Sequence, residues 1–174
     1  LGITSVRGMD NLAASQAADI IVLTVPYAVQ QQTVREVAAA LDGKILVDVT
    51  VPLVPPQVSR VQLPAEGSAV EAVQRLLGDK VRVVSAYQNV SAHHLKDLNH
   101  QIECDVLVCG DDADAREVVI GLTADLGMRG WHAGVLANSV VSEGLTSVLI
   151  AINRRYKVPS AGIRITGVDG GKAH

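Results

Sequence analysis

The sequence predicts an α/β protein built on a parallel sheet, and three observations predict it. Short, continuously apolar runs alternate along the chain with segments whose apolar residues recur at helical spacing. The connections between them are short and rich in Gly, Asp and Pro. Hydrophobic residues make up 48% of the 174 residues and charged residues 19%, so the chain can bury the core of one domain and is not intrinsically disordered.

The first strand is expected at residues 19–25, after a short helix at 11–18 that Asp10 can cap. The strand is apolar throughout and ends at Pro26, as is typical of a strand buried on both faces. A helix at 28–41 and a second strand at 44–49 complete a strand–helix–strand unit. Such a unit implies parallel strands joined by a right-handed crossover.

Three prolines at 52–56 then predict a loop. Ser68 begins the next helix, with Glu71 at the capping-box position. The remaining elements are expected at 80–85 (strand), 86–100 (irregular or weakly helical), 103–109 (strand), 113–126 (helix), 128–133 (strand), 140–156 (amphipathic helix) and 163–166 (strand). We therefore expect two units: the sheet domain at residues 1–133, and a small C-terminal helix–strand unit at 134–174 that closes a cleft.

Composition and motifs exclude several function classes. A net charge of −3 and only 2% aromatic residues argue against nucleic acid as a partner. No uncharged apolar run approaches the length of about 18 residues that predicts a membrane span, so no membrane partner is expected. Cys104 and Cys109 suit buried thiols in a reducing compartment, and no signal peptide is visible, which predicts a cytoplasmic protein.

Metal and nucleophile motifs are also missing from the sequence. His93 and His94 are neighbours that cannot share a helix face, and neither cysteine has a catalytic context. Asp111 and Asp112 follow a strand, where a turn and a helix cap are the expected roles. We therefore predict no metal site and no acid–base catalytic residue.

The loops after the first three strands are the informative places. They are poor in charge and rich in small, apolar and amide side chains at 24–27, 48–55 and 85–90. In an open α/β sheet, ligands bind at the carboxyl ends of the strands. These loops suit a flat, conjugated ligand in a dry cleft, although ordinary connecting loops would have the same composition.

Five regions of the chain carry short motifs that are specific enough to compare with a known family. They are ADIIVLTVP at 18–26, VSAYQNVSA at 84–92, DVLVCGDD at 105–112, AGVLANS at 133–139 with EGLT at 143–146 and INRR at 152–155, and AGIRITG at 161–167. Together, and in this order, they resemble the NADPH-dependent coenzyme F420 reductases (F420H2:NADP oxidoreductases). The resemblance implies a Rossmann-like, doubly wound sheet and hydride transfer between NADP(H) and the deazaflavin F420, with both as cofactors.

The resemblance also implies which residues contact each cofactor. For NADP these are Thr24, Val25, Pro26 and Tyr27. For F420 they are Pro52, Leu53, Val54, Tyr87, Gln88, Asn89, Val90, Asn138 and Ile163. Members of the family carry a His near the position of Gln88, which weakens that assignment. Arg154 and Arg155 are added because F420 carries an anionic phosphodiester and glutamate tail, although cations at a helix C-terminus also stabilise its dipole.

The sequence departs from the family at its start. The family's first strand, its Gly-rich turn for the NADP pyrophosphate and its reader of the 2′-phosphate are not found, a segment of about 70 residues. A fragment and a natural truncation both explain this, and either predicts weak NADP binding. Two alternatives stay open: a non-catalytic F420-binding or assembly module, and another NADP-dependent Rossmann reductase. The apolar helix at 140–156 and an open sheet edge predict a homodimer.

Overall fold

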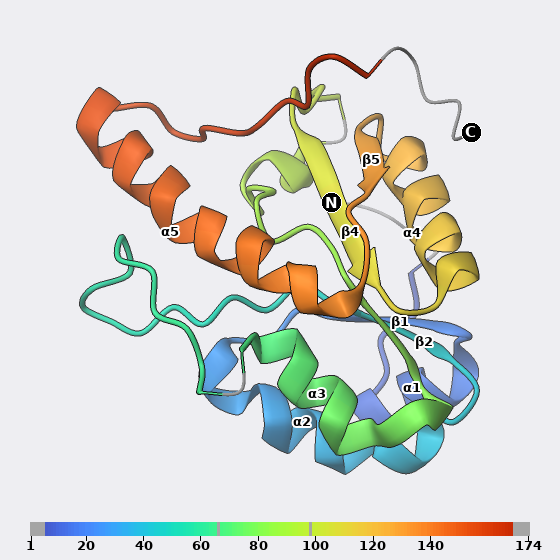
Figure 1. Ribbon diagram of the computed structural model, residues 1–174. Helices are drawn as coiled ribbons and strands as arrows, with labels where there is room; N and C mark the ends of the chain where they lie inside the picture. The colour runs from blue at the N-terminus through green and yellow to red at the C-terminus, as the bar shows by residue number, and fades with distance from the viewer. Residues whose placement is uncertain (1–5, 66, 98, 169–174) are drawn as a thin grey trace.

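The computed structural model describes residues 6–65, 67–97 and 99–168 and contains one five-stranded sheet. Helices cover both of its faces, so the predicted α/β fold is confirmed (Figure 1). The strands lie in the order β1-β2-β3-β4-β5. They are β1 (Ile20–Leu23), β2 (Ile45–Asp48), β3 (Arg82–Ser85), β4 (Asp105–Gly110) and β5 (Arg129–His132).

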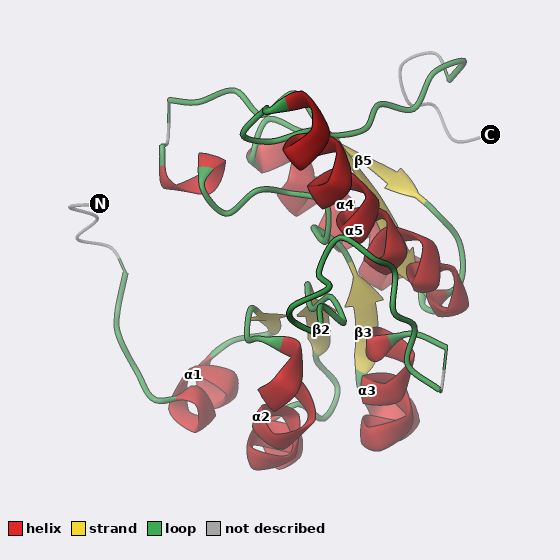
Figure 2. Ribbon diagram, turned by 90° about the vertical axis from the view of Figure 1, so that its left-hand side faces the viewer, coloured by secondary structure: helices red, strands yellow, loops and turns green. Residues whose placement is uncertain are grey.

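The α-helices are α1 (Asn11–Ala17), α2 (Gln30–Val37), α3 (Ala69–Leu77), α4 (Ala113–Asp125) and α5 (Ser139–Tyr156). Short 3₁₀ turns are η1 (Tyr27–Val29), η2 (Ala38–Ala40), η3 (Gly78–Lys80), η4 (His94–Lys96) and η5 (Leu136–Asn138). Figures 1 and 2 both show α1, α2 and α3 side by side below the sheet, with α4 and α5 at the other end of the molecule.

Alternation along the strands separates two hydrophobic clusters. On β2, Leu46 packs with residues of α2 and α3, whereas Ile45 and Val47 pack with residues of α4. All four residues of β2 are buried. For β2, burial of both faces is therefore the physical cause of the continuously apolar run. The same expectation for residues 19–25 is wrong: β1 lies at the edge of the sheet, and Val22 is 48% exposed.

The sheet is mixed and not purely parallel. β1, β2 and β3 are parallel, β3 and β4 are antiparallel, and β4 and β5 are parallel. The connection from β3 to β4 contains the 3₁₀ turn η4 in place of a crossover helix, so β4 enters in the opposite direction. The sequence predicted an irregular or weakly helical segment at 86–100 but not this reversal.

Local sequence signals set the helix ends. Ser68 Oγ accepts from the backbone N–H of Glu71, whose carboxylate accepts from the N–H of Ser68, so the predicted capping box forms. The Asp10 and Asp112 carboxylates cap α1 and α4 by accepting from the N–H groups of Ala13 and Ala115. The helix expected at 28–41 is α2 with 3₁₀ turns on both sides.

The strand predicted at 163–166 does not form. Its segment does lie beside the start of β4, because the N–H of Asp105 donates to Ile163 O (2.9 Å). The next bond, however, runs from the N–H of Ile165 to the Asp105 carboxylate (2.8 Å). A side chain thus takes the place of the backbone partner that a ladder needs. Residues 1–5 and 169–174 of the two predicted units lie outside the described residues.

One helical segment, Leu136–Tyr156, is long and apolar enough to cross a membrane by length and composition. It contains the buried Glu143, whose carboxylate accepts hydrogen bonds from the first turn of α3. These contacts are those of a helix packed within a folded domain, and the absence of a membrane partner stays a prediction.

Candidate functional site at the carboxyl ends of β1, β2 and β3

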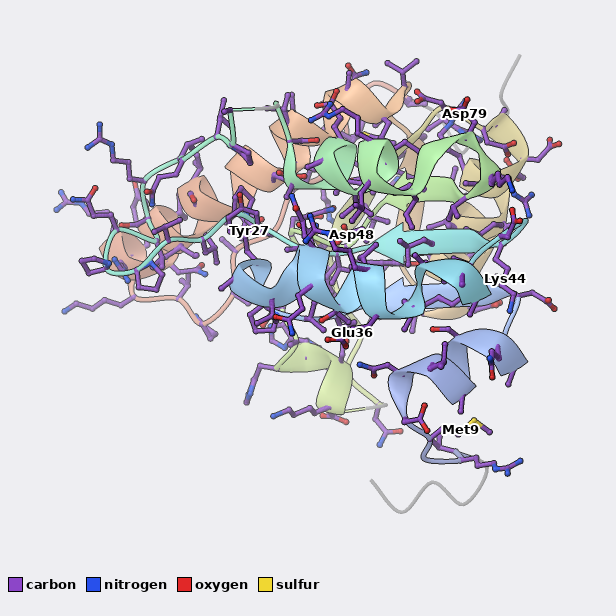
Figure 3. All side chains as sticks on the ribbon, turned by 90° about the horizontal axis from the view of Figure 1, so that it is seen from below. Met9, Tyr27, Glu36, Lys44, Asp48 and Asp79 are labelled. Atoms are coloured by element: carbon purple, nitrogen blue, oxygen red, sulfur yellow. The ribbon has the colours of Figure 1, made fainter. Side chains whose placement is uncertain are left out.

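The carboxyl ends of three parallel strands meet at one edge of the sheet. Their registers place Leu23 beside Asp48 and Asp48 beside Ser85. In Figure 3, Tyr27 and Asp48 lie towards this end of β2, and Lys44 lies at the other end. The predicted cofactor loops therefore start from one edge, as ligand-binding loops of α/β sheets do.

Asp48 connects these loops. Its carboxylate accepts from Gln30 Nε2 on α2 (2.6 Å) and from the N–H of Thr50 (2.9 Å), and its backbone oxygen accepts from Gln88 Nε2 (2.9 Å). The Asp48 side chain is fully buried, and this burial raises its pKa. The Asp48 carboxylate therefore joins the segments that follow β1 and β2, and its backbone oxygen joins the segment that follows β3.

The turn after β3 is strained. Tyr87 has φ +71°, a left-handed conformation that is costly for any residue with a Cβ. Its hydroxyl lies 2.9 Å from Thr123 Oγ1 on α4, which anchors the ring away from the turn. The backbone reversal directs Gln88 and Asn89 into the protein, where both are buried.

The two buried amides have different partners. Asn89 Nδ2 donates to Asp105 O (2.8 Å) and to Cys104 Sγ (3.0 Å), so its donor is already engaged within the protein. Gln88 Nε2 donates to Asp48 O and Ser85 Oγ (2.8 Å), whereas Gln88 Oε1 is buried without a hydrogen-bond partner. A buried carbonyl in this state calls for a donor from outside the described protein atoms.

The start of α5 is fixed to α3 by a second buried carboxylate. Glu143 accepts from the N–H groups of Ala69 (2.9 Å) and Val70 (3.1 Å). Burial is the main cause that raises the pKa of Glu143 to about 7, and the charges of Asp48 and Glu71 raise it further. Thr146 Oγ1, one turn along, donates to Gln88 O (2.8 Å). The helix α5 therefore lies directly over the turn after β3.

Three hollows border these elements. One of about 170 Å³ lies between the turn after β3 and α5, and Gln88, Asn89 and Val90 line it. A larger one of about 480 Å³ shares Asn89 and Val90 and extends to residues 100–104. A third, of about 280 Å³, lies between β1, α1 and α2, and Thr24 and Val25 line it.

The structure thus brings some of the predicted residues together and not others. Gln88, Asn89 and Val90 share one hollow, and Ile163 follows Gly162, which lines the adjoining one. Thr24 and Val25 lie at a separate hollow, while the amide of Asn138 donates to Ala133 O at the start of α5. The remaining predicted residues, which do not line these hollows, are Pro26, Tyr27, Pro52, Leu53, Val54, Tyr87, Arg154 and Arg155.

The cysteines and the paired aspartates have structural partners. Cys104 and Cys109 are free and buried, and burial raises the pKa of the Cys109 thiol to about 11. Asp112 caps α4, and Asp111 accepts from the N–H of Leu136 (2.9 Å). In the part of the chain that the structure describes, no three His, Cys, Asp or Glu side chains are grouped to hold a metal ion.

Comparison with known proteins shows the family. A family model described as "NADP oxidoreductase coenzyme F420-dependent" matches residues 2–52. The chain is 38% identical over 166 residues to the F420-dependent NADP reductase of Methanocaldococcus jannaschii, covering 93% of this chain and 74% of that protein. The chain belongs to the F420-dependent NADP reductase family. The reductase of Methanothermobacter marburgensis is 37% identical over 169 residues, covering 94% of this chain and 75% of that protein.

Solved structures agree on the fold of this reductase family member. A candidate F420-dependent NADP reductase from Arthrobacter sp. FB24 matches with a TM-score of 0.77 at 23% identity, over 90% of this chain and 72% of that one. The imine reductase of Myxococcus stipitatus in complex with NADP⁺ matches with a TM-score of 0.55 at 23% identity. It covers 86% of this chain but only 51% of the imine reductase.

Sequence reasoning missed Asp48, Gln30 and Glu143 as residues that build the site. An Asp at the end of an apolar strand, as in ILVD at 45–48, is a usable signal because a charge there must find partners. Gln30 and Glu143 lie on helices that also carry other polar residues, and nothing in their spacing shows that these two are fully buried.

Proposed function

We propose that this reductase family member transfers a hydride between NADP(H) and F420, with the two rings meeting at the carboxyl edge of β1, β2 and β3. The observation that carries the proposal is the turn at Tyr87–Asn89. It is strained, it is packed under α5, and it leaves the buried Gln88 Oε1 without a donor. Strained backbone and unpaired polar atoms concentrate at functional sites.

The residues present fit the ring of each cofactor. The deazaflavin ring carries an N–H flanked by carbonyls, which can donate to the unpaired Gln88 Oε1 after a small opening of the turn. The hollow beside β1 is lined by apolar and hydroxyl side chains and one amide, without a charged group. Such a lining suits the neutral dihydronicotinamide ring of NADPH, which we place along Thr24, Val25, Pro26 and Tyr27.

The chemistry of the reaction belongs to the cofactors, whose rings exchange a hydride directly when their reacting carbons are close. The protein's part is to orient the rings and exclude water. Asp48 fixes the loops after the three strands relative to one another through its bonds to Gln30, Thr50 and Gln88. Glu143 fixes α5 above them, and so holds the roof of the cleft in place.

The other F420 contacts are proposed from position. The proposed set is Pro52, Leu53, Val54, Tyr87, Gln88, Asn89, Val90, Asn138 and Ile163. The helix and segment at 134–168 supply Asn138 and Ile163 and, in this proposal, act as the small unit that closes the cleft over residues 6–133. Arg154 and Arg155 in the last turn of α5 add long-range attraction for the anionic coenzyme.

The assembly proposed is a cytoplasmic homodimer formed through α5. Val141, Val148, Ile152 and Tyr156 are all exposed, Val141 by 62% and Tyr156 by 71%. Their spacing of seven, four and four residues puts them on one stripe of the helix. A second copy of the chain can cover this stripe. Sedimentation equilibrium showing a monomer at high protein concentration would exclude the dimer.

The proposed location in the cytoplasm, a reducing compartment, is supported by the two free, buried thiols.

Hydride transfer is tested by mixing the protein with NADPH and oxidised F420 and following the loss of the F420 absorbance. Gln88→Met removes the unpaired carbonyl and should weaken F420 binding in a fluorescence titration. Ser85→Ala is the matched control, because it removes an internal partner of Gln88 Nε2 but leaves Oε1 in place. Absence of F420 binding by the wild-type chain contradicts the proposal.

A further inference from the structure

The hollow of about 480 Å³ continues the proposed ring site. It shares Asn89, Val90 and Ser91, together with Pro159–Ala161, with the smaller hollow beside α5. A ligand seated at Gln88 in the small hollow therefore has a direct path past Asn89 into the large one.

Two histidines form part of the lining of the large hollow. The imidazole rings of His94 and His100 are stacked, with centroids 4.2 Å apart and planes inclined by 10°. Both residues line the large hollow. His93, in contact with His94 at 6.0 Å between ring centroids, does not line it.

Short-range hydrogen bonds form among described residues near the two rings. The 3₁₀ turn η4 places the N–H of Asp97 against His94 O (3.2 Å), and the N–H of His100 donates to Asp97 O (3.1 Å). Asp97 Oδ1 accepts from the N–H of Asn99 (3.0 Å). These bonds lie in the same segment as the two stacked rings, which are six residues apart in the sequence.

The charges near the large hollow offset one another, so they do not prevent an anion from binding there. Glu103 contributes a carboxylate to the lining, but Arg164 lies 3.4 Å from it and offsets its charge. Burial raises the pKa of the Cys104 thiol, which stays neutral. Lys96 and Asp97, both exposed in the turn, carry opposite charges. The hydroxyls of Ser91 and Ser160 and the amide of Gln101 also line the hollow, so the imidazole N–H groups are two of several donors there. The stacking of His94 on His100 places two of these donors side by side.

We propose that the His94–His100 pair binds the anionic tail of F420, with the ring held at Gln88 in the adjoining hollow. This inference rests on the proposed function. Imidazole is a donor to phosphate oxygens, and its bonds to an ionised group are short and strong. Arg154 and Arg155 lie in the last turn of α5, outside both hollow linings, and Arg154 Nη1 donates to Ser59 Oγ (3.0 Å). Their role is attraction over a distance.

The experiment compares two ligands in fluorescence titrations: whole F420, and the tail-free deazaflavin that carries only the ring and its ribityl chain. The wild-type chain should bind whole F420 about tenfold more tightly. In His94→Ala/His100→Ala this ratio should fall towards one, with the affinity for the tail-free ring unchanged. His94→Gln/His100→Gln, which keeps N–H donors, should recover part of the ratio, and His93→Ala should keep all of it.

Several outcomes overturn the inference. Equal losses for both ligands in the double Ala variant would show that the histidines only support the fold of the turn. A ratio that survives in that variant but disappears in Arg154→Ala/Arg155→Ala would place the tail along the end of α5. A wild-type chain that binds the tail-free ring as tightly as F420 refutes the tail site alone. A chain that binds neither ligand refutes the proposed function as well.

Discussion

Glu143 Oε2 accepts a hydrogen bond of 2.9 Å from the backbone N–H of Ala69, a residue 74 positions earlier in the chain. Glu143 Oε1 accepts a second from Val70, so the carboxylate occupies the N-terminus of α3, where a negative charge is favoured. The Ser139 and Ser68 hydroxyls, 2.7 Å apart, extend the contact. The position of α5, and with it the roof of the proposed cleft, depends on this buried polar joint.

The first prediction concerns the pH dependence of stability. The pKa of Glu143 is about 7 in the folded protein, above its ordinary value of 4.5. Below pH 4.5 this carboxyl is protonated in both states. Between these values only the folded state holds the proton, so the free energy of unfolding should decrease as pH rises from 4.5 to 7 and then level off, by about 3 kcal/mol at most in total. Urea unfolding at pH 5, 6.5 and 8 measures it.

Glu143→Gln should remove this component of the pH dependence, because the amide does not titrate. Glu36→Gln, at an exposed carboxylate on α2, is the control and should keep the wild-type profile. Parallel pH profiles for wild type and Glu143→Gln would show that the buried joint does not bind the proton.

The second prediction concerns the anchor of the C-terminal segment. The Asp105 carboxylate accepts from Arg129 (two bonds of 3.1 Å), Trp131 (2.8 Å) and the N–H of Ile165 (2.8 Å). Asp105→Asn cannot accept all of them, and we expect a loss of about 2–3 kcal/mol in the free energy of unfolding at pH 7. Chemical denaturation measures this loss, and limited proteolysis should show earlier cleavage near Ile165.

The sign of the pH effect at Asp105 is opposite to that at Glu143. Burial alone would raise the pKa of Asp105, but hydrogen bonds from Ile165, Trp131 and Arg129 lower it below its usual value. Its contribution is therefore complete above about pH 4 and lost as pH falls through the folded pKa. Glu103→Gln, at an exposed ion pair, is the control and should change stability by less than about 0.5 kcal/mol. An equal loss in both variants would contradict the anchor.

The third prediction concerns the wall of the large hollow. A Cβ at Gly162 would lie 2.9 Å from Cys104 Sγ and 3.1 Å from Cys104 Cβ. Gly162→Ala should therefore destabilise by about 1–3 kcal/mol, because Cys104 is buried and its Cβ cannot move away by rotation. In a Cys104→Ala background the same change should cost about 1 kcal/mol less. A double-mutant cycle from urea unfolding measures the difference, and additive effects would argue against the contact.

How far the sequence predicts this molecule depends on which interactions are local. The capping box of Ser68 and Glu71, and the buried strand ILVD, follow from spacing and hydropathy within ten residues. The reversal of β4 does not, because it depends on how residues 86–104 return to the sheet. The strand predicted at 163–166 was wrong because Asp105, a long-range side-chain partner, replaced a backbone one.

The candidate site divides in the same way. Gln88 and Val90 follow a predicted strand, so their place at the carboxyl edge could be foreseen. The engagement of Asn89 with Asp105, and the stacking of His94 on His100, require the path of the loop in space. Sequence reasoning found where a ligand can bind but not which polar atoms are free to contact it.

The last prediction concerns the strained turn and uses two substitutions at one position. A protein with Gly inside a helix or strand is usually about 0.5–1 kcal/mol less stable than the same protein with Ala there, because Gly loses more backbone entropy on folding. Tyr87 has φ +71°, where Ala keeps the left-handed penalty of about 1–2 kcal/mol and Gly does not. Tyr87→Gly should therefore be more stable than Tyr87→Ala by about 1 kcal/mol, the reverse of the usual order. Both variants should be less stable than wild type, because each loses the ring and its bond to Thr123.

The Tyr87→Phe variant loses only that bond, so its free energy of unfolding should decrease by about 1 kcal/mol and its affinity for F420 should be kept. Tyr87→Gly should bind F420 more weakly, because Gln88 is no longer held in one orientation. Urea unfolding and F420 fluorescence titration provide the two measurements. Tyr87→Ala proving more stable than Tyr87→Gly would mean that the turn is unstrained and that its conformation gives no support to the site.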